Sequence, residues 1–479
     1  MAAWARKEIA NTNMKEFGLI ILGGGAAGFA AAMKANEFQG KTLMVNNNAI
    51  GIGGTCVNVG CLPTKHLLYI GEVIHKTKAH NLTGLNTSVS LDFQTIMEGK
   101  DKLIEGLRSE KYEKVLKGLS HVEFIEGEAE FVTRTEISVD GEIYKADKFV
   151  VAAGSSTLVP PIEGIDEVGY LTHIEALQLK ELPESMIVLG GGPLGVEFAQ
   201  MFSRFGSRVC LLEWADRIVP REEPELGILL KSYLEDEGIE ICTGVEAKGV
   251  RQDGREKVVS AAVSGEERAY RGEQLLIATG RRPNTSNLGL EELAIKLGKT
   301  GKVIVNDEMQ AAENIWAAGD VTGEPMLETV AAREGMIAGN NALAENKKRM
   351  DYRVVPHAVF TDPQLGAVGL TDEQGIQGGL VCRCNTVPMA LVSKAQAIKD
   401  TRGAIKVVID NTNQEIVGVH ILAPGAADLI HEGVMIVKNR MTVDDVIETL
   451  HIFPTLSEAT KIGAQSFRRD ITKMSCCVE

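Results

Sequence analysis

Two cysteine pairs of different spacing stand near opposite ends of the chain. Cys56 and Cys61 lie within residues 53–65, which read GGTCVNVGCLPTK, whereas Cys476 and Cys477 are adjacent residues close to the C-terminus. A thiolate is the attacking group in disulfide exchange and also a preferred ligand of soft metal ions. The first pair is therefore suited to redox exchange, and the second is suited to the transfer of a thiophilic ion.

The residues around the first pair favour ionisation of a thiol. Pro63 is typical of the first turn of a helix, and the apolar residues Leu67, Leu68 and Ile70 continue a helical pattern. The partial positive charge at a helix N-terminus lowers the pKa of a nearby thiol, and Lys65 adds a full positive charge. These neighbours make an accidental Cys-x4-Cys pattern a poor explanation.

The remaining four cysteines are interpreted as structural. Cys210 and Cys242 each lie in an apolar run that predicts a packed strand. Cys382 and Cys384 would share one face of a strand, which permits weak metal binding, but no His or Cys partner stands near them. Eight cysteines in 479 residues are too few for a secreted disulfide scaffold, so the paired thiols indicate redox or metal chemistry in a reducing compartment.

Length and charge limit the partners. A chain of 479 residues with 44% hydrophobic content predicts about three domains. The formal net charge of −15, without a basic run, argues against nucleic acid and anionic membranes as partners. The longest apolar stretch, 19–33, is glycine-rich and too short to span a bilayer, and 1–13 is polar with both charge signs. We therefore expect a cytoplasmic protein with small-molecule partners.

A glycine motif follows the first predicted strand. Residues 17–22 are a short apolar strand that runs into GGGAAG and a small-residue helix over 29–34. Gly23 permits the tight turn, Gly25 lets the backbone approach a pyrophosphate, and Gly28 lets helix and strand pack closely. The helix N-terminus then faces the phosphate charge.

The same unit occurs a second time. The apolar strand 186–189 leads into Gly190, Gly192 and Gly195 of GGGPLG and then into a helix over 196–205. Because the motif stands twice in its required strand-to-helix context, the chain is expected to bind two dinucleotides.

Each unit has a second predicted strand, 42–45 in the first unit and 208–212 in the second, and the residue that follows this strand differs between the units. Glu213 follows 208–212 and can accept the ribose 2′-OH of NADH while repelling the 2′-phosphate of NADPH. Asn46 follows 42–45 and can bond a ribose hydroxyl without charge assistance. The alternative for Glu213 is a solvated carboxylate at a strand end. We predict that the second unit prefers NADH.

Three more segments combine an apolar strand with small residues at its end. They are 149–154, ending in Gly154, 275–280, ending in Gly280, and 315–320, ending in Asp320. With these ordered motifs the chain resembles the pyridine nucleotide-disulfide oxidoreductases, the family of dihydrolipoamide dehydrogenase and glutathione reductase, over nearly its whole length. The resemblance implies FAD on the first unit, with Asp320 bonding the ribityl chain, and NAD(P)H on the second.

The resemblance also implies an architecture. Two doubly wound α/β domains are expected, an FAD domain over 1–157 and 287–351 and an NAD(P)H domain inserted into it over 158–286. An α/β dimerisation domain over 352–479 would carry the Cys-Cys tail. Members of this family form homodimers with active sites at the interface.

Roles for the first cysteine pair also follow from the resemblance. Cys61 would face the flavin and Cys56 would exchange with substrate. Lys65 would lie near the reactive flavin nitrogen and pair with Glu197, on the helix of the second glycine motif. The cofactor-contacting residues beside this pair would include Gly54 and Thr55.

One departure separates this chain from the disulfide reductases of the family. Those relatives carry His-Pro followed by Glu, and the His serves as the acid and base for substrate thiols. Here Phe453 occupies the place of that base, before Pro454, and Glu458 follows. His451 stands two residues early, so it is interpreted as an ordinary polar contact. Phenylalanine cannot transfer a proton, which favours a substrate without a protonated sulfur leaving group.

Mercuric ion is such a substrate, because it is soft, binds two thiolates and is reduced to a neutral element. The chain resembles the mercuric reductases in the Cys56 segment, the Phe453-Pro454 replacement, the terminal Ser-Cys-Cys, and three further segments, 359–364, 400–403 and 439–443. In that family the tail thiols of one subunit, here Cys476 and Cys477, pass the ion to Cys56 and Cys61 of the other. All four cysteines are therefore candidate metal ligands. Pro193 and Thr455 stand where many of these enzymes carry tyrosines.

The sequence therefore predicts that this protein is a flavin- and dithiol-dependent Hg(II) reductase that prefers NADH. Two alternatives stay open. A dihydrolipoamide dehydrogenase-like disulfide reductase is favoured by residues 454–458, PTLSE, and opposed by Phe453. A metal-binding flavoprotein without turnover is opposed by the intact Lys65, Glu197 and cysteine pair.

Overall fold

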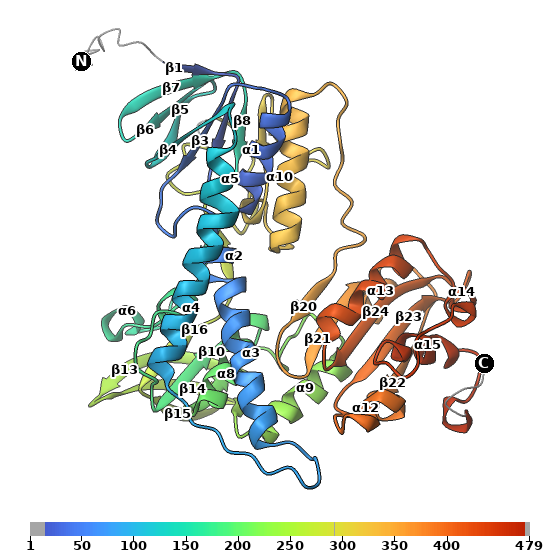
Figure 1. Ribbon diagram of the computed structural model, residues 1–479. Helices are drawn as coiled ribbons and strands as arrows, with labels where there is room; N and C mark the ends of the chain where they lie inside the picture. The colour runs from blue at the N-terminus through green and yellow to red at the C-terminus, as the bar shows by residue number, and fades with distance from the viewer. Residues whose placement is uncertain (1–14, 292, 475–479) are drawn as a thin grey trace. The chain divides into compact units, whose positions relative to one another are not determined.

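The computed structural model describes residues 15–291 and 293–474 and divides into two compact units (Figure 1). Within the described residues, the first unit comprises 15–59, 104–156 and 281–351, and the second comprises 60–103, 157–280 and 352–474. Each unit has its own buried cores.

This division resembles the predicted domains with one difference. The chain leaves the first unit after Ser156 and returns at Arg281, close to the predicted boundaries at 158 and 286. Residues 60–103, which the sequence assigned to the FAD domain, pack in the second unit instead. The reason is helix α3 (Cys61–Lys78), whose apolar residues, among them Leu67 and Leu68, are buried in a core of that unit.

The first unit is built around a six-stranded sheet in the order β18-β19-β8-β2-β3-β4. Its strands, in that order, are β18 (Gln310–Ala312), β19 (Ile315–Ala317), β8 (Phe149–Val151), β2 (Leu19–Leu22), β3 (Thr42–Asn46) and β4 (Val122–Glu126). All neighbours are parallel except β18 and β19. Strand β2 reads LIIL and is buried throughout, as expected for a parallel strand covered on both faces.

Two helices cover this sheet together. Helix α1 (Ala26–Glu37) lies beside α10 (Glu328–Leu343), drawn in blue and gold in Figure 1. The contact is close because Gly335 faces the Ala27 carbonyl oxygen, where a Cβ atom would overlap it. A second sheet of the unit has the order β1 (Lys15–Phe17), β7 (Glu142–Ala146), β6 (Glu136–Val139) and β5 (Ala129–Thr133).

The second unit contains a four-stranded parallel sheet in the order β12-β11-β10-β16. The strands are β12 (Glu240–Cys242), β11 (Arg208–Leu212), β10 (Ser185–Leu189) and β16 (Gln274–Ile277). Helix α8 (Pro193–Phe205) follows β10 directly, and α9 (Pro224–Asp236) lies between β11 and β12 in the chain. The strand and helix order is the doubly wound pattern predicted from the second glycine motif.

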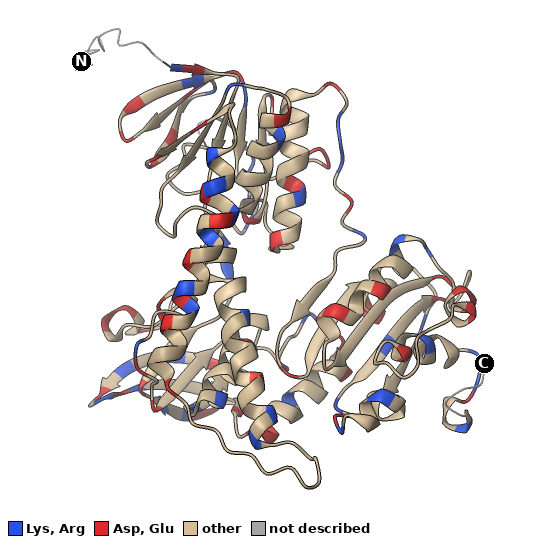
Figure 2. Ribbon diagram, in the orientation of Figure 1, with Lys and Arg blue, Asp and Glu red and all other residues tan. Residues whose placement is uncertain are grey.

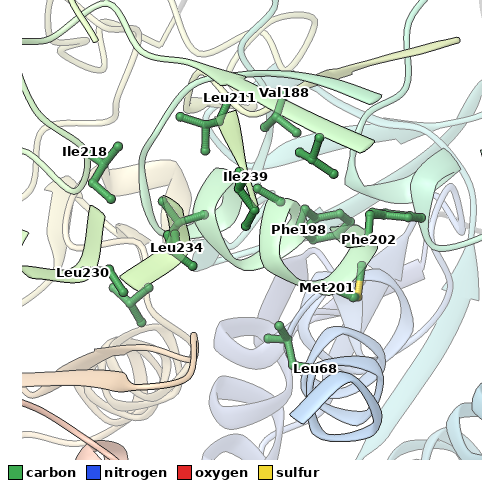
Figure 3. Close-up of a cluster of buried hydrophobic side chains, with 14 of the residues drawn as sticks. Leu68, Val188, Phe198, Met201, Phe202, Leu211, Ile218, Leu230, Leu234 and Ile239 are labelled. Carbon is green, nitrogen blue, oxygen red and sulfur yellow. The ribbon is translucent and has the colours of Figure 1, made fainter. Parts of the chain in front are cut away.

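Helix α8 is the centre of the largest core in this unit. Figure 3 shows Phe198, Met201 and Phe202 of α8 between the strand residues Val188 and Leu211 and the α3 residue Leu68. Phe198 and Phe202 are each 1% exposed. Burying an aromatic side chain stabilises the fold by roughly 1.5–3 kcal/mol. The aromatic residues of α8 therefore stabilise its packing against both the sheet and α3.

Two antiparallel sheets complete the second unit. The smaller has the order β13 (Val245–Asp253), β14 (Glu256–Val263) and β15 (Glu266–Gly272). The larger consists of β20 (His357–Val359), β21 (Gln364–Gly369), β24 (Ile416–Ala423), β23 (Ala404–Asp410) and β22 (Cys382–Pro388). Helices α13 (Ala426–Lys438), α14 (Val443–Glu448) and α15 (Glu458–Gln465) accompany this sheet. They form the α/β region predicted to mediate dimerisation.

Charges of both signs are mixed along the surface helices. Figure 2 shows this on α4 (Phe93–Arg108), which carries Lys100, Asp101, Lys102 and Glu105. Among the described residues, every helix is too short or too polar to cross a bilayer.

Candidate functional site

The first glycine motif forms as predicted in the first unit. Gly23 has φ of +120°, and a Cβ atom there would overlap the Ala152 carbonyl oxygen. A Cβ atom at Gly28 would overlap the Gly23 carbonyl oxygen, so both positions require glycine. Gly25 is the N-cap of α1 and offers no capping side chain. The first amides of α1 are therefore left for a ligand.

Asn46 has a structural role that the sequence did not reveal. It ends β3, and its Oδ1 accepts a hydrogen bond from the backbone N–H of Gly24, 3.0 Å away. A Cβ atom at Gly24 would come within 2.9 Å of the Asn46 side chain. Asn46 therefore supports the glycine loop itself, besides standing where a ribose hydroxyl is expected.

The segment around Cys56 is anchored to that loop. Helix α2 (Gly54–Val59) begins at Gly54, which has φ of +68°, and a Cβ atom there would lie 2.7 Å from the Cα of Gly25. Asn58 holds the turn before α2 by donating from Nδ2 to the carbonyl oxygens of Ile52 and Gly54, each at 2.9 Å. Thr55 and Cys56, both predicted site residues, thus lie on a short helix that starts against the glycine motif.

Polar groups gather where neighbouring parallel strands end. Gly154 follows β8, has φ of +70°, and has open space where a Cβ would lie. Asp320 follows β19 and accepts a hydrogen bond from Ser155 Oγ at 2.5 Å. Arg281 Nε donates to the same Ser155 oxygen at 2.7 Å and lies 3.7 Å from the Asp320 carboxylate. Ligands of doubly wound sheets bind at this edge, beside the loop that carries Gly23.

These residues fit the predicted FAD. The uncapped N-terminus of α1 suits a pyrophosphate, and nothing but the Gly54 Cα lies within 4 Å of a Cβ built on Gly25. Asp320 has side-chain exposure of 22% and an oxygen available to a hydroxyl-bearing chain. Lys65 and Cys61 belong to the second unit.

The second glycine motif repeats the geometry of the first. Gly190 has φ of +107°, and a Cβ atom there would overlap the Ala278 carbonyl oxygen. A Cβ atom at Gly195 would overlap the Gly190 carbonyl oxygen. Gly192 is the N-cap of α8, has open space on its Cβ side, and precedes Pro193 at the first helical position. The site fits the pyrophosphate of a nicotinamide dinucleotide.

Glu213 occupies the place that Asn46 has in the first unit. Its Oε2 accepts the backbone N–H of Gly191, and its Oε1 accepts that of Ala215 at 2.7 Å. Its own N–H donates to the Cys242 carbonyl oxygen at 2.9 Å. Glu213 is 9% exposed, so it is not a solvated carboxylate at a strand end. Gly280, with φ of +123°, has open space on its Cβ side.

Lys65 and Glu197 form the ion pair that the resemblance implied. Cys61 is the first residue of α3, after the N-cap Gly60, and is exposed. One turn later, Lys65 Nζ lies 2.7 Å from Glu197 Oε2, and Glu197 is 4% exposed. The Lys65 ammonium also lies 4.5 Å from the centre of the Phe360 ring, and the backbone N–H of Phe360 donates to Glu197 Oε1 at 2.9 Å.

A buried network fixes the segment that carries Phe360. Gln200 on α8 exchanges two hydrogen bonds of 2.8 Å with the backbone of Asp362. The Asp362 carboxylate accepts from Arg204 and from Arg402, each at 2.9 Å. Burial alone would raise the pKa of Asp362, but the guanidinium charges of Arg402 and Arg204 hold it below the ordinary value. Two segments that carried the family resemblance, 359–364 and 400–403, therefore meet here.

Two titratable residues, His451 and Glu458, stand close to Phe453 in the chain. His451 Nε2 lies 2.6 Å from Glu432 Oε1, and its Nδ1 faces the Thr449 carbonyl oxygen at 3.0 Å. The hydrogen bond to Glu432 raises the pKa of His451. His451 thus makes the polar contact expected of it, and its lack of a role in the reaction stays a prediction. Burial raises the pKa of Glu458, whose Oε2 has no hydrogen-bond partner among the described residues.

The tail thiols Cys476 and Cys477 lie outside the described residues. Within 15–291 and 293–474, no group of three or more His, Cys, Asp or Glu side chains could hold a metal ion.

Family models match most of the chain. Residues 17–335 match the model described as pyridine nucleotide-disulphide oxidoreductase, and 355–463 match its dimerisation domain. The chain is 37% identical to mercuric reductase of Staphylococcus aureus over 96% of this chain and 84% of that protein. It is 35% identical to dihydrolipoyl dehydrogenase of Thermus scotoductus over 95% of this chain and 98% of that protein.

A solved structure resembles this chain over nearly its full length. The HOCl-induced flavoprotein disulfide reductase RclA from Escherichia coli superposes with a TM-score of 0.84 at 29% identity, covering 95% of this chain and all of that one. The predicted fold class and family resemblance are confirmed by these matches.

Proposed function

This chain belongs to the pyridine nucleotide-disulphide oxidoreductase family, and we propose that its substrate is Hg(II), reduced to the neutral metal with electrons from NADH. The family uses FAD and NAD(P)H, the two cofactors that the resemblance implied for the two glycine motifs. The match over 355–463 indicates a homodimer. We further propose that the active site is shared between the two subunits and that the enzyme works in the reducing environment of the cytoplasm.

The observation that carries this proposal is the apolar residue at the place of the family's base. Reduction of a disulfide releases a thiolate that an acid must protonate, and Phe453 cannot supply a proton. His451 is held by Glu432 at 2.6 Å. Reduction of Hg(II) adds two electrons to the ion and releases its thiolate ligands, so no protonated leaving group is required.

The other parts of a two-electron relay are present. FAD, when bound, accepts hydride from NADH and supplies the two electrons. Glu197 and the Phe360 ring hold Lys65 in one place, one helical turn after Cys61. A fixed ammonium at that position favours the thiolate form of a neighbouring cysteine. This arrangement argues against a flavoprotein that binds metal without turnover.

The ion itself would be moved by thiol exchange. In the proposed route, Cys476 and Cys477 take Hg(II) from a soluble thiol carrier and pass it to Cys56 and Cys61 of the partner subunit. Each transfer exchanges one mercury–sulfur bond for another, so the thiolates need no electrons until the ion is held by the inner pair.

A disulfide reductase is the second candidate. Glu458 keeps the place of the acid that supports the family's His, and a dihydrolipoyl dehydrogenase is among the similar proteins. The buried and unpartnered Glu458 Oε2 would suit a histidine at position 453.

NADH oxidation separates these candidates. The purified enzyme should oxidise NADH rapidly with Hg(II) bound to excess small thiol, slowly with lipoamide, and very slowly without either. Rapid lipoamide reduction would transfer the assignment to the disulfide reductases. Oxidation that Hg(II) does not accelerate would favour metal binding without turnover.

A variant tests the specific role of Phe453. Phe453→His should gain lipoamide reduction, because it restores a base beside Glu458, and should leave Hg(II) reduction nearly unchanged. Ile452→His, which places an imidazole one residue away at a position that is 79% exposed, compared with 47% for Phe453, serves as the control. Equal lipoamide activity in the parent and in Phe453→His would refute the argument from the missing base.

A further inference from the structure

Two cysteines outside the redox motif lie on neighbouring strands of the second unit. Cys210 is on β11 and Cys242 is on β12, which is the edge strand of the parallel sheet. The strand register pairs Cys210 with Glu240 and Leu212 with Cys242. Because residues two apart on a strand share a face, Cys210 and Cys242 point to the same side of the sheet.

The offset between the two cysteines suits a bridging ion better than a disulfide. Strands about 4.8 Å apart and a rise of about 3.3 Å per residue place the two Cα atoms about 8 Å apart. A disulfide requires Cα atoms less than about 7 Å apart. Metal–sulfur bonds of about 2.3 Å in a linear arrangement would join two sulfur atoms about 4.6 Å apart. Two thiols on this diagonal can meet that separation.

A buried hydroxyl points to a ligand at the same place. Tyr270 on β15 is 8% exposed and packs in one hydrophobic cluster with Cys210, against the half-buried Cys242. Its hydroxyl makes no hydrogen bond of ordinary geometry among the described residues, and the polar group that acts on it is the neighbouring Cys242 thiol. Burial and the neighbouring Cys242 raise the pKa of Tyr270 to about 12, so the phenol keeps its proton. It can therefore donate to a sulfur atom that carries negative charge.

We propose that Cys210 and Cys242, with the Tyr270 hydroxyl, form a second binding site for a two-coordinate thiophilic ion such as Hg(II). Ions that need three or four protein ligands, such as Zn²⁺, do not fit, because the described residues hold no group of three suitable side chains. The site differs from Cys56 and Cys61, and it needs neither NADH nor reduction of the ion. It therefore stands apart from the proposed function.

Binding proceeds by exchange without electron transfer. Cys242 is half-buried and its Sγ donates to Glu240 at 3.9 Å, whereas Cys210 is 8% exposed. An ion held by two small thiolates reaches Cys242 first and Cys210 second. At each step one S–H bond breaks, one sulfur–metal bond forms, and the departing thiolate takes the proton. Burial raises the pKa of the Cys210 thiol, so this buried thiol keeps its proton until an ion arrives.

The test uses a full-length variant, the background, that lacks the other cysteines proposed to bind Hg(II). In this background, serine replaces Cys56, Cys61, Cys476 and Cys477. This background is incubated with Hg(II) in excess glutathione, dialysed against glutathione, and analysed by native mass spectrometry. We expect one Hg(II) to remain bound per chain, together with sulfur-to-metal absorption in the ultraviolet. NADH fluorescence and circular dichroism report whether each variant is folded.

Further substitutions in this background locate the ion. Cys242→Ser, at a half-buried position, and Cys210→Ala should each remove the glutathione-resistant Hg(II). Tyr270→Phe should weaken its retention about tenfold, the loss expected for a hydrogen bond to a charged sulfur. Cys382→Ser with Cys384→Ser is the matched control and should change nothing. Retention of Hg(II) by folded Cys242→Ser, or its loss from the control, would overturn the proposal.

Discussion

Glu213 offers the sharpest test of how the second unit recognises its nucleotide. The two carboxylate oxygens accept one backbone N–H each, from Gly191 and from Ala215. Glu213→Gln keeps the shape of the side chain but leaves it one acceptor oxygen. Its amide nitrogen must then face one of the two backbone N–H groups, and because both groups are donors, that hydrogen bond is lost.

The expected losses have two parts. An unpaired buried N–H costs about 1–3 kcal/mol, so the variant should unfold at a lower temperature. Two unit charges about 4 Å apart repel by about 4 kcal/mol at an effective dielectric constant near 20. Solvent at the ribose reduces that figure, and we expect a parental preference for NADH of at least ~1.4 kcal/mol, about tenfold. Without the carboxylate this preference should nearly disappear.

The assay is kcat/KM for NADH and for NADPH, measured for the parent and the variant with the same Hg(II) complex. Asp236→Asn is the matched control, because it removes an exposed carboxylate at the end of α9 in the same unit. It should leave both the nucleotide preference and the unfolding temperature unchanged. Equal kcat/KM for the two nucleotides in the parent, or a preference unchanged in Glu213→Gln, would refute the reasoning.

Three further predictions concern the thiols and one histidine. One equivalent of NADH should give the parent a long-wavelength thiolate-to-flavin absorption band that Cys61→Ser lacks, and a surviving band would assign the flavin-facing thiol elsewhere. Cys476→Ala/Cys477→Ala should slow turnover sharply with Hg(II) on bulky thiols and much less with small complexes, with flavin reduction by NADH intact; unchanged rates would remove the tail from the mechanism. Because Glu432 raises the pKa of His451, that pair stabilises the fold fully below about pH 6.5 and less as pH rises through the folded pKa. The difference in unfolding temperature between the parent and Glu432→Gln should therefore shrink with rising pH, and a difference that grows with pH would contradict this.

Local sequence was sufficient to predict the two dinucleotide-binding units. The glycine motifs depend on backbone contacts between residues only a few positions apart, such as Gly28 against Gly23. The strand-end positions of Asn46 and Glu213 also follow from chain order. Local rules therefore determine both the type of site and the residues at its edge.

Long-range contacts were not predictable in the same way. The Lys65–Glu197 pair came only from the family resemblance, and the Phe360 ring beside Lys65 was not anticipated. The bond of Asp362 to Arg204 joins residues far apart in sequence, and no periodic pattern reports such a contact. Residues 60–103 also pack in the second unit through contacts of this long-range kind.

Asn46 and Glu213 hold their glycine loops with the same contact, yet only Glu213 has a charge. Selectivity is a difference in affinity between competing ligands, so it has value only where a competitor exists. A nicotinamide nucleotide exchanges in every catalytic cycle and competes with a form that differs by one phosphate. A flavin that stays bound meets no such rival. If Glu213 selects NADH as predicted, a neutral amide is sufficient at the resident cofactor, and a negative charge is needed only in the pocket whose ligand is exchanged at each turnover.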